Sequence, residues 1–315
     1  MKVAPDTAVS GVVSGVVPDT VPDAAAGRPG RPADFITLMK PRLNLLALFT
    51  TLAGLYLAAP DGVPLALLAH TLAGTALVAG GAAALNQVWE RRTDALMHRT
   101  GSRPLPQGRL GVGESTGFGL LLSVLGLGEL ALGVNLATAA VALVTLVSYV
   151  AVYTPLKTRT WHSTLVGAFP GALPPVIGWA AATGGVGWGA VTLFAIIFFW
   201  QMPHFLALAW LFREDYARAG MLVLPVIEPD GRSTGRHALL YAGTLVGVSA
   251  TPVAVGLAGS AYLLLAGVLG IALLALCYDF RRSLTQHAAR RVFLASITYL
   301  PLLLGGLLLD RLWLR

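Results

Sequence analysis

The chain has 315 residues, of which 56% are hydrophobic and 12% are charged, and its mean hydropathy is +0.72. Soluble domains carry about twice this charged fraction, so the composition excludes an ordinary soluble domain. Several apolar runs reach the ~20 residues that a helix needs to cross a bilayer, and the alternating polarity of a membrane β-barrel is missing. We therefore expect an all-α polytopic membrane protein in a lipid bilayer. The net charge is +7, but the arginines lie in links between the apolar runs, so we expect no nucleic-acid partner.

The N-terminal segment differs in composition from the rest of the chain. Residues 1–33 contain repeated Pro-Asp pairs that interrupt the short apolar stretches, so they form neither a signal peptide nor a span. We predict a disordered cytoplasmic tail over residues 1–33 and one transmembrane domain over residues 34–315. The single cysteine, Cys277, lies in an apolar run. A disulfide within the chain is impossible, and we expect this side chain to have a packing role.

Nine apolar segments follow in chain order. The predicted spans are residues 43–60, 64–85, 111–133, 136–156, 164–184, 189–212, 237–258, 260–280 and 291–310. Short links, in which Asp61 is the only formal charge, alternate with longer basic links, and 20 of the 22 Lys and Arg residues lie in the tail and the basic links. Cytoplasmic loops carry the excess of Lys and Arg. We therefore predict that the N-terminus and the basic links are cytoplasmic and that the C-terminus is outside.

The first long basic link begins with a stripe of polar side chains. Asn86, Glu90 and Asp94 are spaced by four residues, so they share one face if the second span continues as a helix to Asp94. They would then lie at the C-terminal end of that helix, where the macrodipole disfavours anions. Oxygen ligands in this position favour a bound cation such as Mg²⁺, which prefers carboxylates and phosphate oxygens. The rise of ~12 Å along the stripe implies two ions or a bent helix end.

Arginines follow this stripe along the same link, at Arg91, Arg92, Arg99, Arg103 and Arg109. Arginine pairs bidentately with phosphate and stays charged. The mixture of acids and arginines therefore predicts a site for a magnesium diphosphate. The alternative interpretation is a solvated cytoplasmic loop, whose surface ion pairs contribute little.

Further polar groups lie on the same predicted side of the membrane. After the sixth span, Glu214 and Asp215 form a second acidic pair, and Tyr216 can donate a hydrogen bond through its hydroxyl. Two acidic links on one side can close on one site. The other cations considered there are Lys40, Arg42, Lys157 and Arg159. Each of these cations also satisfies the positive-inside rule without any binding role.

The sixth span contains polar residues, which are costly inside a membrane and therefore informative. Gln201, Pro203 and His204 occur together in the sequence WQMPHF. The imidazole of His204 can satisfy a backbone group, contact a substrate or ligate a metal. A hydrogen-bonded packing role is the commoner alternative for a lone histidine in a membrane helix.

Five motifs occur in order along the chain: NQVWERRTDALMHRTGSRPLP from Asn86, YTPLKTRT from Tyr153, GALPPVIGWAA from Gly171, WQMPHFLALAW from Trp200 and EDYARAGMLVLP from Glu214. Together they resemble the protohaem IX farnesyltransferase family, a branch of the UbiA-type intramembrane prenyltransferases. The resemblance covers about residues 35–310. It implies nine helices around a central cavity, with a diphosphate site that is capped by cytoplasmic loops.

The resemblance also implies an activity and its participants. A Mg²⁺-dependent enzyme would transfer the farnesyl group of farnesyl diphosphate to a vinyl group of haem B, with addition of water, to give haem O. Haem B is then a substrate and not a cofactor. The enzyme would lie in the cell (cytoplasmic) membrane with its site on the cytoplasmic side, and haem A synthase or oxidase assembly factors are candidate partners.

Three alternatives to this activity stay open, of which one is an assembly scaffold without catalytic activity. The nearest is a related prenyltransferase that acts on a quinone precursor or on chlorophyllide. A membrane transporter is more distant, because its charged residues would line a pathway at mid-bilayer, whereas the carboxylates here cluster at one surface.

Carried over residue by residue, the resemblance assigns roles to the polar groups above. The metal ligands would be Asn86, Glu90, Asp94, Glu214 and Asp215, and the catalytic residues would be Asn86, Glu90, Asp94, Asp215 and Lys157. The substrate-binding residues would be Arg99, Arg103, Arg159, Tyr153, Tyr216, His204, Lys40 and Arg42. The chain departs from the family pattern at Arg92, where an acid is expected, and at Ala219, four residues after Asp215.

Overall fold

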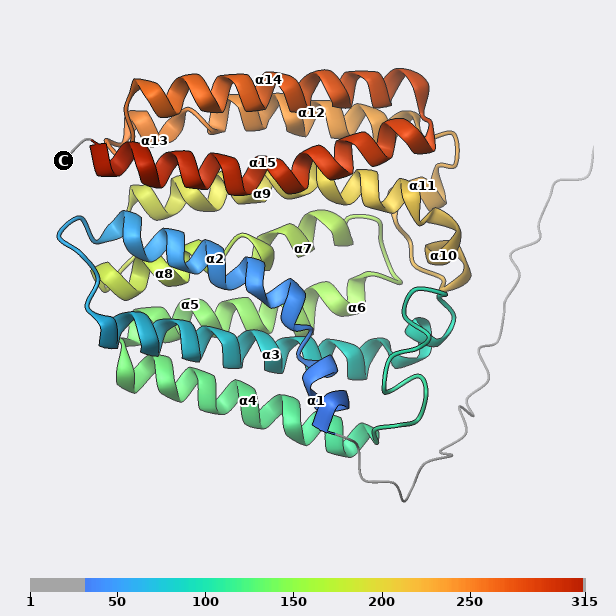
Figure 1. The fold of residues 1–315 in the computed structure, drawn as a ribbon. Helices are drawn as coiled ribbons and strands as arrows, with labels where there is room; N and C mark the ends of the chain where they lie inside the picture. The colour runs from blue at the N-terminus through green and yellow to red at the C-terminus, as the bar shows by residue number, and fades with distance from the viewer. Residues whose placement is uncertain (1–31, 314–315) are drawn as a thin grey trace, which may run out of the picture.

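A computed structural model describes residues 32–313 (Figure 1). Within these residues the regular secondary structure is helical, without a strand, and nine helical segments are long and apolar enough to cross a membrane. The predicted all-α polytopic fold is therefore confirmed. The predicted tail lies outside the described residues, except that Pro32 and Ala33 form the start of a helix, α1 (Pro32–Leu38).

The spans are built from helices whose limits mostly lie within three residues of the predicted ones. The long elements are α2 (Pro41–Ala58), α3 (Leu65–Ala95), α4 (Val112–Gly133), α5 (Leu136–Val147), α7 (Ser163–Gly171), α8 (Pro174–Thr183), α9 (Trp188–Leu211), α12 (Arg232–Val248), α14 (Ser260–Ser283) and α15 (Gln286–Trp313). The largest difference is at the end of the second span. There α3 continues to Ala95, ten residues beyond the predicted limit, and carries the polar stripe on a helix.

Three spans are not single regular helices. The fourth consists of α5, the π-helix η1 (Ser148–Tyr153) and the short α6 (Thr154–Leu156). The fifth is interrupted between α7 and α8, where two prolines lack the N–H groups that would continue the hydrogen-bond ladder. The seventh consists of α12 and α13 (Thr251–Ala254), and α10 (Arg213–Arg218) and α11 (Leu224–Ile227) lie between spans six and seven.

The helices form two groups that lie side by side (Figure 1). One contains α9, α12, α14 and α15, and the other contains α2, α3, α4, α5 and α8. Helices α2 and α8 approach closely at two glycines: a Cβ on Gly54 would lie 2.1 Å from Pro175 O, and one on Gly178 would lie 1.9 Å from Thr51 O. Small residues permit such close backbone packing, which stabilises helix pairs in membranes.

The largest hydrophobic core lies in the group that contains α9. It includes the fully buried side chains of Tyr262, Phe280 and Leu303. Cys277 is also buried there, which confirms its packing role. Helix α9 also contacts α8 of the other group, and its Gln201 Nε2 donates to Ala168 O of α7 at 3.1 Å.

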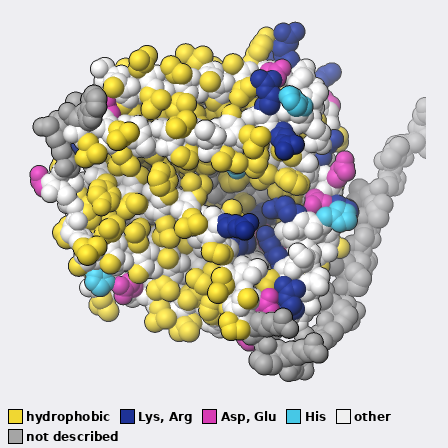
Figure 2. Space-filling model, in the orientation of Figure 1, with side chains coloured by type: hydrophobic (Ala, Val, Ile, Leu, Met, Phe, Trp, Pro, Cys, Tyr) yellow, Lys and Arg dark blue, Asp and Glu magenta, His cyan; other side chains and the backbone are white. Residues whose placement is uncertain are grey.

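Charge and apolar surface are separated along the helices. Hydrophobic side chains cover most of the face in Figure 2, whereas Lys and Arg side chains gather toward the end where α3 and α9 finish. This face has a hollow near the start of α2. Helices α9 and α15 lie on one side of the hollow and α3 lies on the other, and Lys and Arg side chains lie at it (Figures 1 and 2). We call this hollow the recess.

Candidate active site

The end of α3 carries a stripe of buried polar side chains. Asn86, Glu90 and Asp94 are 0%, 6% and 1% exposed. Helix α3 continues to Ala95, so all three side chains lie on one helix at a spacing of four residues, as predicted. Burial of a carboxylate is costly unless it is paired, and the helix C-terminus adds the repulsion of the macrodipole. These side chains therefore need cationic or hydrogen-bonding partners, and those partners indicate what the site can bind.

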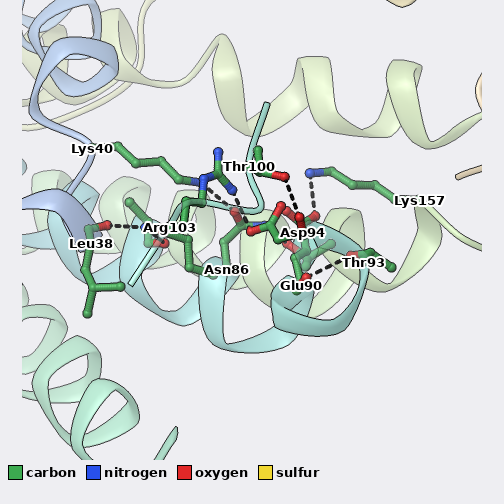
Figure 3. A network of polar contacts seen from close by, with 12 residues as sticks. Leu38, Lys40, Asn86, Glu90, Thr93, Asp94, Thr100, Arg103 and Lys157 are labelled. Carbon is green, nitrogen blue, oxygen red and sulfur yellow. Dashed lines mark hydrogen bonds and ion pairs between the residues drawn. The ribbon is translucent and has the colours of Figure 1, made fainter. Parts of the chain in front are cut away.

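Two lysines from distant parts of the chain reach the first two members of the stripe (Figure 3). Lys40, between α1 and α2, donates to Asn86 Oδ1 at 2.8 Å. Lys157, just after α6, places its Nζ 2.5 Å from Glu90 Oε1, and the two side chains are 18% and 7% exposed. Lysines were predicted on this side of the membrane, but their individual partners were not.

Asp94 is held by the loop that follows α3. Arg103 Nη1 donates to Asp94 Oδ2 at 2.6 Å, and Thr100 Oγ1 donates to Asp94 O at 3.0 Å. Farther along the loop, Arg109 Nε donates to Asp34 Oδ1 of α1 at 3.0 Å. The loop over residues 96–111 is thus attached at two points, and it places one of the predicted arginines on the stripe.

The π-helix η1 orients the amide of Asn86. Asn86 Nδ2 donates to Thr154 Oγ1 at 3.1 Å, and Thr154 Oγ1 donates to Tyr149 O at 2.8 Å. A hydroxyl has one proton, so Thr154 can only accept from Asn86. The amide nitrogen therefore faces Thr154, and the amide oxygen faces Lys40. π-Helical turns are rare and frequently occur at functional sites.

Lys40 adopts a backbone conformation that few side chains tolerate. Its φ of 48° and ψ of 56° lie in the left-handed region, which costs roughly 1 kcal/mol or more and is typical of functional sites. The carbonyls of the two preceding residues are both held: Gln87 Nε2 donates to Leu38 O at 2.7 Å, and Asn44 Nδ2 donates to Met39 O at 2.6 Å. The turn between α1 and α2 therefore directs the ammonium group of Lys40 to the stripe.

Burial and neighbouring charge give the two lysines opposite pKa shifts. Burial, together with the positive charge of Arg103, lowers the pKa of Lys40 to about 7. Burial also lowers the pKa of Lys157, but Tyr153 and Glu90 outweigh this effect and raise that pKa above its ordinary value. Lys157 is therefore charged at neutral pH, whereas Lys40 is near its titration midpoint and would gain charge beside a bound anion.

The second acidic link lies against the first. Asp215 on α10 pairs with Arg218 and accepts hydrogen bonds from the backbone N–H groups of Arg99 and His98. Arg218 Nη1 also donates to His98 Nε2 at 2.5 Å. Burial raises the pKa of Asp215, but these hydrogen bonds outweigh it and hold the pKa below its ordinary value. The two acidic links are thus in direct contact.

The other predicted residues of this link have different environments. Tyr216 packs against a small cluster in which Met97 of the first link meets Ala219 and Met221, and the Arg99 guanidinium lies 5.6 Å from the ring centre of Phe212. Glu214 is exposed and belongs to none of the ion pairs of the stripe. Among the second acidic pair, Asp215 is therefore the residue tied to the first link.

Of the remaining predicted cations and aromatic residues, some join the network around the stripe and others do not. The Tyr153 ring lies 4.6 Å from Lys157 Nζ and 5.5 Å from the ring of Tyr149, so it joins the network. Arg42 and Arg159 are exposed, and they form none of the hydrogen bonds or ion pairs described above for the stripe. Sequence reasoning missed Gln87, Tyr149 and Thr154. The only signal for these three residues in the sequence is that each is an uncharged polar residue in or near one of the motifs.

The donor set of the stripe fits a hard divalent cation. The described residues contain no group of three or more His, Cys, Asp or Glu side chains that could hold a metal by themselves. A cation here would therefore also use the amide oxygen of Asn86 and oxygens of the substrate. Asp94 Oδ1 is buried and has no hydrogen-bond partner among residues 32–313, which leaves one carboxylate oxygen available. Carboxylate and amide oxygens suit Mg²⁺.

Residues 32–313 thus form a nine-span membrane protein whose buried acids pair with cations at one end, so that a charged site adjoins an apolar interior. The family model of the UbiA prenyltransferases matches residues 47–298, and the chain belongs to this family. Similar proteins from several bacteria carry the name protoheme IX farnesyltransferase. The protein of Solibacter usitatus is 48% identical over 287 residues, covering 88% of this chain and 98% of the relative. That of Myxococcus xanthus is 43% identical, covering 91% of this chain and 97% of the relative.

Solved structures share the fold at low sequence identity. A digeranylgeranylglyceryl phosphate synthase superposes with a TM-score of 0.76 at 16% identity, over 89% of this chain and 98% of the other. A UbiA homologue from Archaeoglobus fulgidus bound to GPP and Mg²⁺ superposes with a TM-score of 0.59 at 16% identity, over 87% of this chain and 99% of the other. The polytopic prenyltransferase fold expected from the motifs is thereby confirmed.

Proposed function

We propose that this enzyme transfers the farnesyl group of farnesyl diphosphate to a vinyl group of haem B, with addition of water, to give haem O and diphosphate. One observation carries the chemistry: the buried stripe of Asn86, Glu90 and Asp94 is met by cations from three separate segments. The relatives named protoheme IX farnesyltransferase, at up to 48% identity over most of both chains, support the choice of haem as acceptor.

The stripe and its cations would divide the diphosphate between them. Asn86, Glu90 and Asp94 would hold Mg²⁺, with Asp215 and Glu214 as further ligands from the second link. When bound, Mg²⁺ neutralises negative charge on the diphosphate and stabilises it as a leaving group. A UbiA homologue bound to GPP and Mg²⁺ supports this assignment.

The chain's own cations would bind the remaining phosphate oxygens. Lys40, Arg103 and Lys157 already converge on the stripe, and an arriving diphosphate would replace their contacts with its amide and carboxylate oxygens by phosphate contacts. The other proposed contacts come from the surrounding links and aromatic rings: Arg42, Arg99, Tyr153, Arg159 and Tyr216.

The reaction then needs exclusion of water more than it needs a covalent nucleophile. The bond from the first farnesyl carbon to the diphosphate oxygen breaks, and the haem vinyl group attacks that carbon. Water captures the resulting cation next to the porphyrin and releases one proton, so that diphosphate leaves and a hydroxyethylfarnesyl chain remains. The apolar helices around the recess protect the allylic cation from premature capture.

The setting of the enzyme follows from charge asymmetry. The described chain is a multi-pass membrane protein, and its basic links lie at the end that carries the stripe. Under the positive-inside rule this end is cytoplasmic in the cell membrane, with the N-terminus inside and the C-terminus outside. Haem A synthase or an oxidase assembly factor is the proposed protein that receives the product.

Haem extraction from cells tests this function. Expression in a bacterial host that lacks haem O synthesis should restore haem O, and Glu90→Gln should abolish it. Recovery of haem B alone, from membranes that contain the folded protein, would contradict the proposal. A new prenylated quinone or chlorin in the same extract would identify a related prenyltransferase instead.

A further inference from the structure

The imidazole ring of His204 is fixed between α9 and α15. It stacks on Trp200 of its own helix, with 5.4 Å between ring centres, and on Phe293 of α15, with 4.9 Å. Trp200 is itself held, because its Nε1 donates to Ser296 O at 2.7 Å. Two aromatic rings therefore set the plane of the imidazole, which is the rigidity that a preorganised binding group needs.

Ser296 determines which nitrogen of His204 carries the proton. Ser296 Oγ donates to Phe293 O at 2.7 Å, which uses its single hydroxyl proton. His204 Nδ1 lies 2.8 Å from the same oxygen, so it must be the donor in that hydrogen bond. The neutral ring therefore carries its proton on Nδ1 and a lone pair on Nε2.

The lone pair on His204 Nε2 is available to a ligand. This atom has no hydrogen-bond partner among residues 32–313, and it is not one of the buried unpaired polar atoms. Metal-ligating histidines usually have this arrangement, in which one ring nitrogen donates to a fixed acceptor and the other faces the metal. Without such a ligand, a ring nitrogen in an apolar span that lacks a hydrogen-bond partner is energetically unfavourable.

The position of His204 suits the acceptor of the proposed reaction. Seven residues of α9, about 10 Å, separate it from Leu211 at the charged end of the helix, and the recess adjoins this half of α9 (Figures 1 and 2). We propose that His204 Nε2 is an axial ligand to the iron of the haem acceptor, and that Ser296 is the residue that positions it. This inference rests on the proposed function, because it concerns the acceptor side of that site.

Haem titration of the purified full-length protein, without farnesyl diphosphate, tests the ligand. Wild type should give the absorption and electron paramagnetic resonance signature of histidine-ligated ferric haem. His204→Ala should lose that signature, and added imidazole should restore it. Ser296→Ala should weaken haem binding by about tenfold, as loss of an outer-shell partner does. Unchanged spectra and haem affinity in His204→Ala would overturn the proposal.

Two controls separate ligation from damage to the fold. Iron-free protoporphyrin IX should bind wild type and His204→Ala equally well, because it has no iron to ligate. His237→Ala, which removes a ring that contacts Ser233 O instead, should keep the wild-type haem spectrum. If wild type shows His204-dependent haem binding but forms no haem O, the proposed function fails and the ligand assignment stands. If haem O forms but the haem spectrum does not depend on His204, the ligand assignment fails and the proposed function stands.

Discussion

Thr154 Oγ1 accepts a hydrogen bond from Asn86 Nδ2 at 3.1 Å and so joins the π-helix of the fourth span to the polar stripe of the second. The same hydroxyl donates to Tyr149 O, which leaves it no second proton. The orientation of the Asn86 amide is therefore determined by the backbone of η1. A deviation from regular helix in one span thus fixes the amide of a proposed metal ligand in another.

Removal of the Thr154 hydroxyl should weaken metal binding. Thr154→Val keeps the shape of the side chain but releases the Asn86 amide, so the apparent affinity for Mg²⁺ should fall by about tenfold. Thr154→Ser should restore it. The measurement is the Mg²⁺ dependence of activity, together with direct Mn²⁺ binding followed by electron paramagnetic resonance. Equal ion affinities in the Val variant and wild type would show that η1 does not position Asn86.

Neutralisation of Glu90 should affect catalysis much more than neutralisation of a carboxylate elsewhere. Glu90→Gln removes a proposed Mg²⁺ ligand and leaves Lys157 without its anionic partner, so the turnover rate should fall by about 100-fold or more. Glu129→Gln is the matched control, because Glu129 pairs with His70 on α3, far along the helix from the stripe. Similar rates for the two variants would contradict the assignment of Glu90.

The lowered pKa of Lys40 predicts a pH dependence of substrate binding. A bound diphosphate stabilises the charged lysine, so binding takes up a proton above pH 7, and affinity should fall as pH rises from about 7 to 9, by at most tenfold per unit. Lys40→Met should bind more weakly, and the part of the pH dependence due to Lys40 should be missing. Equilibrium binding of farnesyl diphosphate to both proteins measures this difference, since titration of the ligand is common to both. Parallel pH profiles would contradict it.

The lowered pKa of Lys40 affects folding stability in the opposite direction to substrate affinity. In the unfolded chain Lys40 titrates near 10.5, so between about pH 7 and 10.5 the unfolded state binds more protons than the folded state. The contribution of Lys40 to the free energy of unfolding should therefore increase with pH across that window. Thermal unfolding of wild type and Lys40→Met in detergent should diverge accordingly.

The contact between the two acidic links should depend on Asp215. Asp215→Asn weakens its pairing with Arg218 and with the backbone of His98 and Arg99, so amide hydrogen exchange at residues 96–103 should become faster. Asp230→Asn, which removes the charge of an exposed pair with Arg232, should leave that exchange unchanged. If the exchange rates of this loop are the same in both variants, Asp215 does not hold the links together.

The spans and the stripe were predictable because both depend on local sequence. Apolar length alone locates a membrane helix, and a spacing of four residues aligns Asn86, Glu90 and Asp94 wherever the helix continues. The resemblance assigned roles to Arg103 and Lys157, but it did not indicate that they pair with Asp94 and Glu90. Their individual partners depend on how the loop after α3 and the end of α6 turn back, which no local pattern determines.

The features that escaped prediction are set by packing between distant segments. Lys40 reaches Asn86 across 46 residues of sequence, and Thr154 reaches it across 68. The π-helix η1 has no sequence signature of its own, because its residues would also suit an ordinary apolar helix. Ser296 contacts His204 across 92 residues, so the tautomer of that ring is visible only in the folded chain.

The reaction proposed for this site joins a farnesyl group to haem. The most direct measurement combines purified protein, farnesyl diphosphate, haem B and Mg²⁺, and follows both haem O by mass spectrometry and released diphosphate. We expect equimolar haem O and diphosphate, both dependent on Mg²⁺ and both absent in Glu90→Gln. Diphosphate release without haem O, or haem O formation that continues in Glu90→Gln, would contradict it.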